Sequence, residues 1–235
     1  TVDIAAKNIL VTGGARGIGR AVVLALAGAG ANVVTCYRQE SEATASLIGE
    51  LKNTTGQHHV VRADVRDPGQ IGELVAVCRE QFGSLDAVVN NAGVISHVPY
   101  EELGLDEWHR IVDTNLTGAF LVTQKALPLL GSGSSVVHIG SRVSTVGIPQ
   151  RAHYTAAKAG MVGLARSQAK ELGSRGIRVN VVEPGVIETE EAAKLPPEAY
   201  EKLQARYRAM TALGRLGDPA EIGKVVVFLV SDLSS

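Results

Sequence analysis

The stretch TGGARGIG, at positions 12–19, joins an apolar, β-branched run to a segment of helical character at 17–30. Its glycines Gly13, Gly17 and Gly19 permit positive φ angles in a tight turn and let a bound group reach the backbone. A helix that begins there meets an anion with free N–H groups and the positive end of its dipole. The stretch therefore predicts a phosphate-binding turn. A tight turn without a ligand is the alternative.

Outward from this turn, apolar runs and amphipathic segments alternate along the chain. The apolar runs predict six strands, at 7–12, 32–37, 58–64, 86–90, 135–140 and 177–182. Helix-length segments lie at 17–30, 40–53, 68–82, 106–130, 152–173 and 218–231. Continuous apolar strands indicate a sheet that is buried on both faces. The order predicts an α/β fold, a Rossmann-type doubly wound parallel sheet with helices on both faces.

Composition narrows the class of protein. The chain has 235 residues, of which 45% are hydrophobic and 20% charged, with a formal net charge of −1. These values exclude a disordered chain and argue against a general nucleic-acid binder. No linker, composition shift or repeat divides 1–235, so we expect a single domain. Two cysteines, Cys36 and Cys78, are too few for a disulfide framework. We find no signal peptide and no apolar stretch of about 18 residues, so we expect a cytoplasmic protein.

Residues 188–213 interrupt the alternation of strands and helices. This segment is charged, carries Pro196 and Pro197, and follows a strand directly. Ligands of α/β sheets bind at the carboxyl ends of the strands. We therefore interpret 188–213 as a lid over a substrate pocket, with a solvated helical excursion as the alternative.

The end of the second strand indicates which nucleotide is bound. An acidic residue there would bind a ribose 2′-hydroxyl and favour NAD. The sequence has Tyr37 and Arg38 instead, with no carboxylate until Glu40, and Arg16 lies in the glycine turn. Two guanidinium groups suit a 2′-phosphate, so we predict NADP(H). A surface position for Arg38 is the alternative.

The segment YTAAK places Tyr154 and Lys158 at i and i+4, on one helix face. A phenol with a pKa of about 10 is a poor acid–base group, but a nearby ammonium lowers that pKa toward a useful range. Ser141 ends the strand SVVHIG and could hold a substrate carbonyl or hydroxyl beside the phenol. Asn115 lies within a predicted helix, where Asn has mediocre propensity. Its polar side chain there indicates that Asn115 holds a bound water in a proton path. The alternative is a buried amide whose hydrogen bonds are satisfied within the protein.

With these residues the chain resembles the short-chain dehydrogenase/reductases over nearly its whole length. TGGARGIG matches the family's cofactor motif, NNAG at 90–93 its structural motif, and GRLGDPAEI at 214–222 the bend before its last long helix. The positions that fall at the spacing of its catalytic tetrad are Asn115, Ser141, Tyr154 and Lys158. The residues that the resemblance assigns to the cofactor are Gly13, Arg16, Gly17, Ile18, Gly19, Tyr37, Arg38, Asp64, Val65, Asn91, Ala92, Gly93, Tyr154, Lys158, Pro184, Gly185, Ile187 and Thr189.

The resemblance implies a reductase in which hydride passes from the nicotinamide to a carbonyl carbon while Tyr154 donates a proton to the oxygen. Ser141 would orient the carbonyl. Lys158 would lower the phenol pKa and hold the nicotinamide ribose, and Asn115 would keep a water that links Lys158 to solvent. The alternatives are an NAD-dependent alcohol dehydrogenase and, more remotely, a non-catalytic cofactor-sensing protein.

Within the family, the chain resembles the 3-oxoacyl-carrier-protein reductases and the ketoreductases of aromatic, angucycline-type polyketides. Arg175 matches one docking arginine of the fatty-acid enzymes, but the other falls at Ser132, which argues against docking of an acidic carrier protein. Stretches such as VVTCYRQESEA resemble these polyketide ketoreductases, which favours an aromatic polyketide intermediate as the substrate and hence a role in antibiotic biosynthesis. A 3-oxoacyl-carrier-protein reductase of fatty-acid synthesis is the alternative.

Four further side chains are expected to flank the substrate pocket. His97 and His153 could hydrogen-bond a polar substrate, and Arg142 and Arg151 would suit a phenolate or carboxylate. Surface positions are the alternative for all four. The remaining histidines show no metal-ligand spacing, so we predict no metal.

The resemblance also concerns the end of the chain and its assembly. The family continues beyond Ser235 into a seventh strand, so we expect that strand to be absent from this chain. The helices at 106–130 and 152–173 would form the usual dimer surface. The resemblance thus implies a homodimer or homotetramer.

Overall fold

The computed structural model describes residues 3–190 and 194–235. Within them, six strands form one parallel sheet in the order β3-β2-β1-β4-β5-β6. The strands are β1 (Asn8–Val11), β2 (Asn32–Tyr37), β3 (His58–Arg62), β4 (Leu85–Asn90), β5 (Leu130–Ile139) and β6 (Arg178–Val182). The order reverses between β1 and β4, which leaves a crevice at the carboxyl ends of these two strands. The predicted doubly wound parallel sheet is confirmed.

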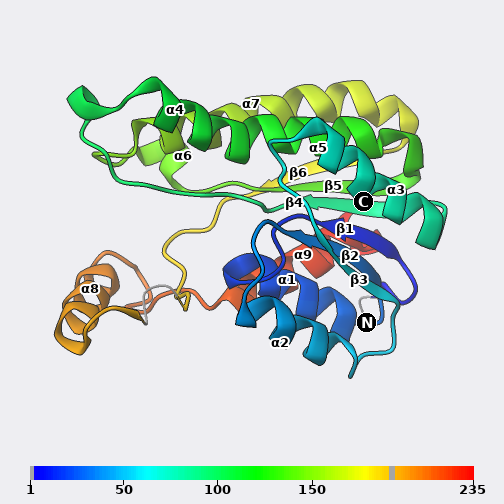
Figure 1. The fold of residues 1–235 in the computed structure, drawn as a ribbon, viewed down its shortest axis with the longest axis horizontal. Coiled ribbons are helices and arrows are strands. Elements are labelled where there is room, and N and C mark those ends of the chain that lie inside the picture. Colours follow the sequence, from blue (N-terminus) through cyan, green and yellow to red (C-terminus); the bar gives the residue numbers. More distant parts are fainter. Residues whose placement is uncertain (1–2, 191–193) are drawn as a thin grey trace.

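Helices cover both faces of this sheet. They are α1 (Gly17–Gly28), α2 (Glu42–Leu51), α3 (Pro68–Phe82), α4 (Leu105–Val112), α5 (Gly118–Ala126), α6 (Val143–Val146), α7 (Ala152–Leu172), α8 (Pro197–Ala209) and α9 (Pro219–Val230). Figure 1 shows α1, α2 and α9 on one face, and α3, α5 and α7 on the other. Among the described residues, no helix is long and apolar enough to cross a membrane.

Alternation along β1 shows why both faces of the sheet are apolar. Ile9 and Val11 belong to the core under α1 and α9, whereas Leu10 belongs to the core under α3 and α5. All three side chains are fully buried. A continuous apolar strand is required here because every residue of it faces a helical layer.

Three segments differ from the predicted elements. The helix expected at 106–130 is divided by a π-helical turn, Asp113–Thr117, and ends in a 3-10 turn, Leu127–Leu129. Strand β5 begins at Leu130 and not at 135, with a register irregularity against β4 between Leu85 and Ala87. The short helix α6 has too few residues to produce a periodic apolar pattern.

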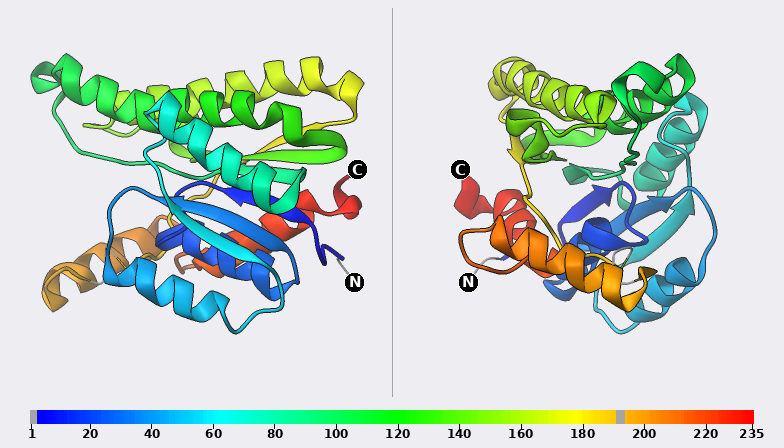
Figure 2. Two further views of the ribbon diagram at one scale, coloured as in Figure 1. Left: turned by 45° about the vertical axis from the view of Figure 1, so that its right-hand side comes forward. Right: turned by 90° about the vertical axis from the view of Figure 1, so that its left-hand side faces the viewer.

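The segment interpreted as a lid contains α8, which lies on the α1 side of the molecule, away from the sheet (Figure 2). Residues 191–193 of that segment lie outside the described residues. The two ends of the segment are held close to each other, and its interior has hydrogen bonds of its own. Ile187 forms an isolated bridge with Gly217, and Glu188 accepts hydrogen bonds from Tyr200 and from Gln204 Nε2, the latter at 3.0 Å.

Candidate active site

The glycine turn is held open by backbone geometry and one amide side chain. Gly13 and Gly17 have φ angles of +70° and +56°. The side chain of Asn91 reaches across from the end of β4, and its Nδ2 donates to the carbonyls of Thr12 and Gly13, both at 3.0 Å. A Cβ at Gly19 would lie 2.1 Å from Gly13 O and 2.3 Å from Asn91 Nδ2. Only glycine fits at position 19, because any side chain would collide with the turn itself.

This crowding predicts the effect of Gly19→Ala. The added methyl must push the turn or Asn91 aside, so the N–H groups that would face a phosphate lose their arrangement. We expect the Kd of the predicted nucleotide, NADP(H), to rise at least about tenfold, or about 1.4 kcal/mol. Gly28→Ala, on the same helix with nothing within 4 Å of its Cβ, is the matched control. Equal Kd values for the two variants, measured by NADPH fluorescence, would contradict this reading.

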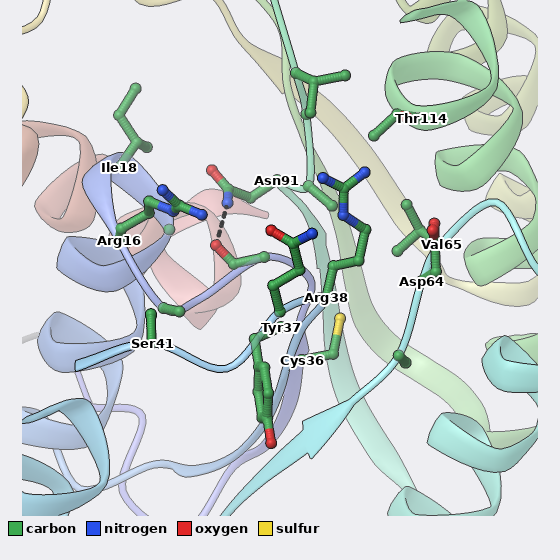
Figure 3. A pocket seen from close by; sticks show the side chains of 18 of the residues that line it. Arg16, Ile18, Cys36, Tyr37, Arg38, Ser41, Asp64, Val65, Asn91 and Thr114 are labelled. Carbon is green, nitrogen blue, oxygen red and sulfur yellow. Dashed lines mark hydrogen bonds between the residues drawn. The ribbon is translucent and has the colours of Figure 1, made fainter. Parts of the chain in front are cut away.

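A pocket of about 730 Å³ opens over the turn, at the carboxyl edge of the sheet (Figure 3). The predicted cofactor residues that line it are Gly13, Arg16, Ile18, Gly19, Tyr37, Arg38, Asp64, Val65, Asn91, Ala92, Gly93 and Thr189. Residues that line it and that sequence reasoning did not identify are Ala15, Cys36, Gln39, Ser41, Ala63, Val94, Ile95, Arg110 and Thr114. Of these, Ser41 carried a signal, because it caps α2 directly after the end of β2.

Positive charge surrounds the part of the pocket beside β2. Figure 3 shows Arg16 and Arg38 at this pocket, with Arg38 between Arg16 and Asp64. The carboxylate of Asp64 is held by Arg66, with Nη2 2.6 Å from Oδ2. This hydrogen bond, and more weakly the charge of Arg38, lower the pKa of Asp64. Asp64 therefore stays ionised, and its charge is largely balanced by Arg66.

An acidic side chain from the 188–213 segment contacts the glycine turn. The backbone N–H of Gly17, at the N-terminus of α1, donates to Glu190 Oε1 at 2.8 Å. A carboxylate at this place is stabilised by the helix dipole as a phosphate would be. The contact places the 188–213 segment, which is far from the glycine turn in sequence, against the predicted phosphate site.

Three of the predicted catalytic residues come together beyond the pocket. Ser141 follows β5, and its hydroxyl lies close enough to Tyr154 on α7 to lower the pKa of the phenol. Lys158 is buried one helical turn further along, with Nζ 5.7 Å from the centre of the Tyr154 ring. Helix α7 and the end of β5 thus converge on one phenol.

Burial shifts the pKa of both ionisable groups at this site. Burial raises the pKa of Tyr154 above its ordinary value, while Ser141 and Arg151 lower it in part. Lys158 donates to Ile139 O at 2.7 Å, and its burial lowers the pKa of the ammonium to about 8. Because Nζ of Lys158 lies 5.7 Å from the centre of the Tyr154 ring, the expectation that its charge lowers the pKa of the phenol stays a prediction.

Asn115 lies in the π-helical turn between α4 and α5. Its Nδ2 donates to Val94 O at 2.8 Å and to Ile111 O at 2.9 Å. Its Oδ1 is buried and has no hydrogen-bond partner among the described residues. A Cβ at Gly93 would lie 2.6 Å from this oxygen, so Gly93 is required for the approach. A buried acceptor without a partner is costly and fits a bound water.

The four side chains expected at the substrate pocket separate into three groups. Nε and Nη2 of Arg151 lie 2.9 Å and 2.6 Å from His97 Nε2, at the surface. Arg142 is exposed in the turn after β5, and its backbone N–H donates to Pro184 O. His153 is fully buried, with Nε2 2.9 Å from Ser96 Oγ and 4.0 Å from Glu107 Oε1. We therefore correct the expectation for His153, since its buried ring offers no face to a substrate.

The thiols of the two cysteines are not reactive in this structure. Cys36 and Cys78 are buried and free, and burial raises the pKa of their thiols to about 11 and about 12. Both therefore remain protonated at neutral pH. In residues 3–190 and 194–235, no cluster of His, Cys, Asp and Glu side chains could hold a metal ion.

Comparison with known proteins agrees with this geometry. Residues 13–235 match a family model described as Enoyl-(Acyl carrier protein) reductase. A 3-oxoacyl-acyl-carrier-protein reductase FabG of Staphylococcus aureus is 38% identical over 228 residues, which cover 96% of this chain and 91% of that protein. The corresponding FabG of Thermotoga maritima is 38% identical over 231 residues, covering 97% and 92%.

Solved structures give the same result. A dehydrogenase/reductase from Sinorhizobium meliloti 1021 has a TM-score of 0.91 at 32% identity, covering 99% of this chain and 90% of that one. A short-chain dehydrogenase/reductase from Serratia marcescens has a TM-score of 0.90 at 32% identity, covering 98% and 93%. The chain belongs to the short-chain dehydrogenase/reductase family, and it is an oxidoreductase.

Proposed function

We propose that this enzyme is an NADPH-dependent ketoreductase with Tyr154 as the proton donor. The observation that carries the proposal is the convergence of Tyr154, Ser141 and Lys158 beyond a glycine-cradled pocket. The pocket fits a dinucleotide for two physical reasons. The glycine turn leaves room where side chains would block a phosphate, and two arginines stand beside it.

The bound cofactor would supply a hydride to the carbonyl carbon. Tyr154 would donate its proton to the carbonyl oxygen, which Ser141 orients through a hydrogen bond. The ammonium of Lys158, near the Tyr154 ring, would stabilise the phenolate that remains. The buried Oδ1 of Asn115 would accept from a water on the path that returns the proton. The remaining cofactor residues proposed from the family motif are Gly17, Pro184, Gly185 and Ile187.

The preference for NADPH is proposed to depend on Arg38. Its guanidinium lines the pocket at the end of β2, where a carboxylate would instead favour NAD. We expect Arg38→Ser to reduce the NADPH-over-NADH ratio of kcat/KM about ten- to a hundredfold, since one charged hydrogen bond is worth about 1.5–3 kcal/mol. Arg79→Gln, on α3, is the control. A wild-type enzyme that prefers NADH would reject the proposal for Arg38.

For the substrate we propose a 3-oxoacyl thioester. The names of the relatives reported above favour it over the aromatic polyketide that the sequence led us to expect. Delivery by a carrier protein is less well supported. The guanidinium of Arg175 donates to the carbonyls of Leu127 and Leu130, at 3.1 Å and 3.3 Å, and Ser132 stands where a second docking cation would be needed.

The test is NADPH oxidation with a 3-oxoacyl-coenzyme A, with the same acyl group on an acyl carrier protein, and with polycyclic aromatic ketones. We expect turnover of the thioesters, with little gain from the carrier protein. Faster turnover of the aromatic ketones would restore the polyketide alternative. NADPH binding without any turnover in this panel would overturn the assignment as a reductase.

The segment 188–213 and the assembly complete the proposal. We propose that 188–213 closes over the substrate, since Glu190 already reaches the glycine turn.

We also propose a homodimer or homotetramer, because Phe120 on α5 and Phe228 on α9 are 40% and 43% exposed. Analytical ultracentrifugation measures the assembly, and a monomer at micromolar concentration would refute that part.

A further inference from the structure

A chain of side-chain hydrogen bonds runs from the wall of the pocket to the start of α7. Its members are Arg110 and Glu107 on α4, Ser96 in the loop after β4, and His153 in the first turn of α7. The guanidinium of Arg110, which lines the pocket, holds the Glu107 carboxylate through two hydrogen bonds, Nε to Oε2 at 2.6 Å and Nη2 to Oε1 at 2.7 Å. Helices α4 and α7 lie side by side (Figure 1). Three segments that are distant in sequence are thus joined by four side chains.

The donor of each hydrogen bond in this chain follows from its partners. The hydrogen bonds from Arg110 and Ser96 lower the pKa of Glu107 to about 2, so its carboxylate has no proton to give. Ser96 therefore donates its one hydroxyl proton to Glu107 Oε1. The oxygen of Ser96 is left to accept from His153, whose Nε2 lies 2.9 Å away. His153 thus carries a proton on Nε2, whether its ring is neutral or charged.

The start of α7 depends on such a contact. Arg151, at the N-cap position, makes no capping hydrogen bond with its side chain among the described residues. The first N–H groups of a helix have no partner within the helix, and a side-chain cap normally fixes them. The ring of His153 is completely buried, so loss of its hydrogen bond would leave a buried donor unsatisfied. The bond to Ser96 therefore holds the first turn of α7 against the loop 91–99.

Tyr154 directly follows His153 in the same turn of α7. Any movement of this turn that breaks the hydrogen bond of His153 must also move the phenol. A proton donor acts only within hydrogen-bond reach, and a displacement of about 1 Å can cost about a hundredfold in rate. Lys158, one turn further along, is fixed separately by its hydrogen bond to Ile139 O. The chain and Lys158 thus fix α7 on the two sides of the phenol.

We propose that the hydrogen-bonded chain from Arg110 to His153 positions the Tyr154 hydroxyl for proton transfer by fixing the first turn of α7. Ser96 and Glu107 are the positioning residues within the chain. The proposal rests on Tyr154 being the proton donor of the proposed reaction. It gives His153, which the sequence placed at the substrate, a role that needs no contact with the substrate.

The first measurement is amide hydrogen exchange of residues 151–158 in the cofactor-free protein, which reports how firmly this turn is held. Ser96→Ala and His153→Phe each remove one partner of the central hydrogen bond, whereas Ser96→Thr keeps the hydroxyl. We expect exchange at 151–158 to become about tenfold faster or more in the first two variants, because a buried hydrogen bond is lost. Ser96→Thr should exchange as the wild type does.

The second measurement is steady-state reduction of a ketone by NADPH. Ser96→Ala should lower kcat about ten- to a hundredfold and leave the KM of the ketone and the Kd of NADPH unchanged, because only the donor is displaced. Ser96→Thr should restore kcat. Ser174→Ala is the matched control, because this exposed serine lies just after the far end of α7. It should change neither the exchange at 151–158 nor the kinetics.

Two results would overturn the proposal. One is wild-type exchange at 151–158 in Ser96→Ala, and the other is a loss of activity that lies only in the KM of the ketone or the Kd of NADPH. The exchange measurement needs no turnover. It therefore decides whether the chain holds the first turn of α7 even if no ketone is reduced, a failure that would count against the proposed function alone.

Discussion

Replacing Tyr154 with phenylalanine is expected to lower kcat for ketone reduction by about 10²- to 10⁴-fold, the usual contribution of a positioned general acid. The phenol is the group on which Ser141 and Lys158 converge, and phenylalanine keeps the ring while removing the proton. The Kd of NADPH should change little, because the proposed phosphate site is made by the glycine turn and Tyr154 does not line that pocket.

The measurement is steady-state NADPH oxidation beside NADPH fluorescence titration. Tyr100→Phe is the control, because Tyr100 is 81% exposed and its loss should leave both quantities unchanged. A Tyr154→Phe enzyme that retains more than about a tenth of wild-type kcat would show that another group donates the proton. In that case Ser141 would be the first residue to re-examine.

Replacing Lys158 with methionine is expected to abolish turnover and yet to stabilise the fold. Burial lowers the pKa of Lys158 from 10.5 to about 8, so holding the charge inside the folded protein is unfavourable. At 1.36 kcal/mol per pKa unit, the cost of that charge is about 3 kcal/mol below pH 8. Methionine has similar length and no charge, and it removes this cost together with the hydrogen bond to Ile139 O.

The dependence on pH follows from the direction of the shift. Below about pH 8 both folded and unfolded chains carry the proton on Lys158, and the full cost is present. Between about pH 8 and 10.5 the unfolded chain binds the proton that the folded one has lost, so wild-type stability rises with pH. Above 10.5 the cost has gone, and the advantage of Lys158→Met with it.

Urea unfolding of the cofactor-free proteins at neutral and alkaline pH measures this effect. Lys170→Met is the matched control, because Lys170 lies on the same helix and is exposed. We expect no gain in stability for the control and a gain of about 2–3 kcal/mol for Lys158→Met at neutral pH, shrinking with alkali. A destabilised Lys158→Met would mean that the lost hydrogen bond outweighs the relief of the buried charge.

Much of the fold could be predicted because its signals are local. The strand β2 was predicted with the bounds that it has, since NVVTCY is a continuous apolar run between turn residues. The glycine turn was recognised for the same reason, because positive φ angles at Gly13 and Gly17 require glycine. The division of 106–130 by a π-helical turn could not be predicted, because the amide of Asn115 reaches Val94 O in a loop far from it in sequence.

By itself, the sequence determined the parallel sheet, the glycine turn and the residue types proposed for proton transfer, because strands, turns and helix faces depend on neighbours along the chain. Only the tertiary structure decided how those residues act. It buried His153, directed Lys158 at Ile139 O, and placed Arg151 against His97. Burial, charge and hydrogen bonding set the acidity of a side chain, and all three depend on contacts between segments that are distant in sequence.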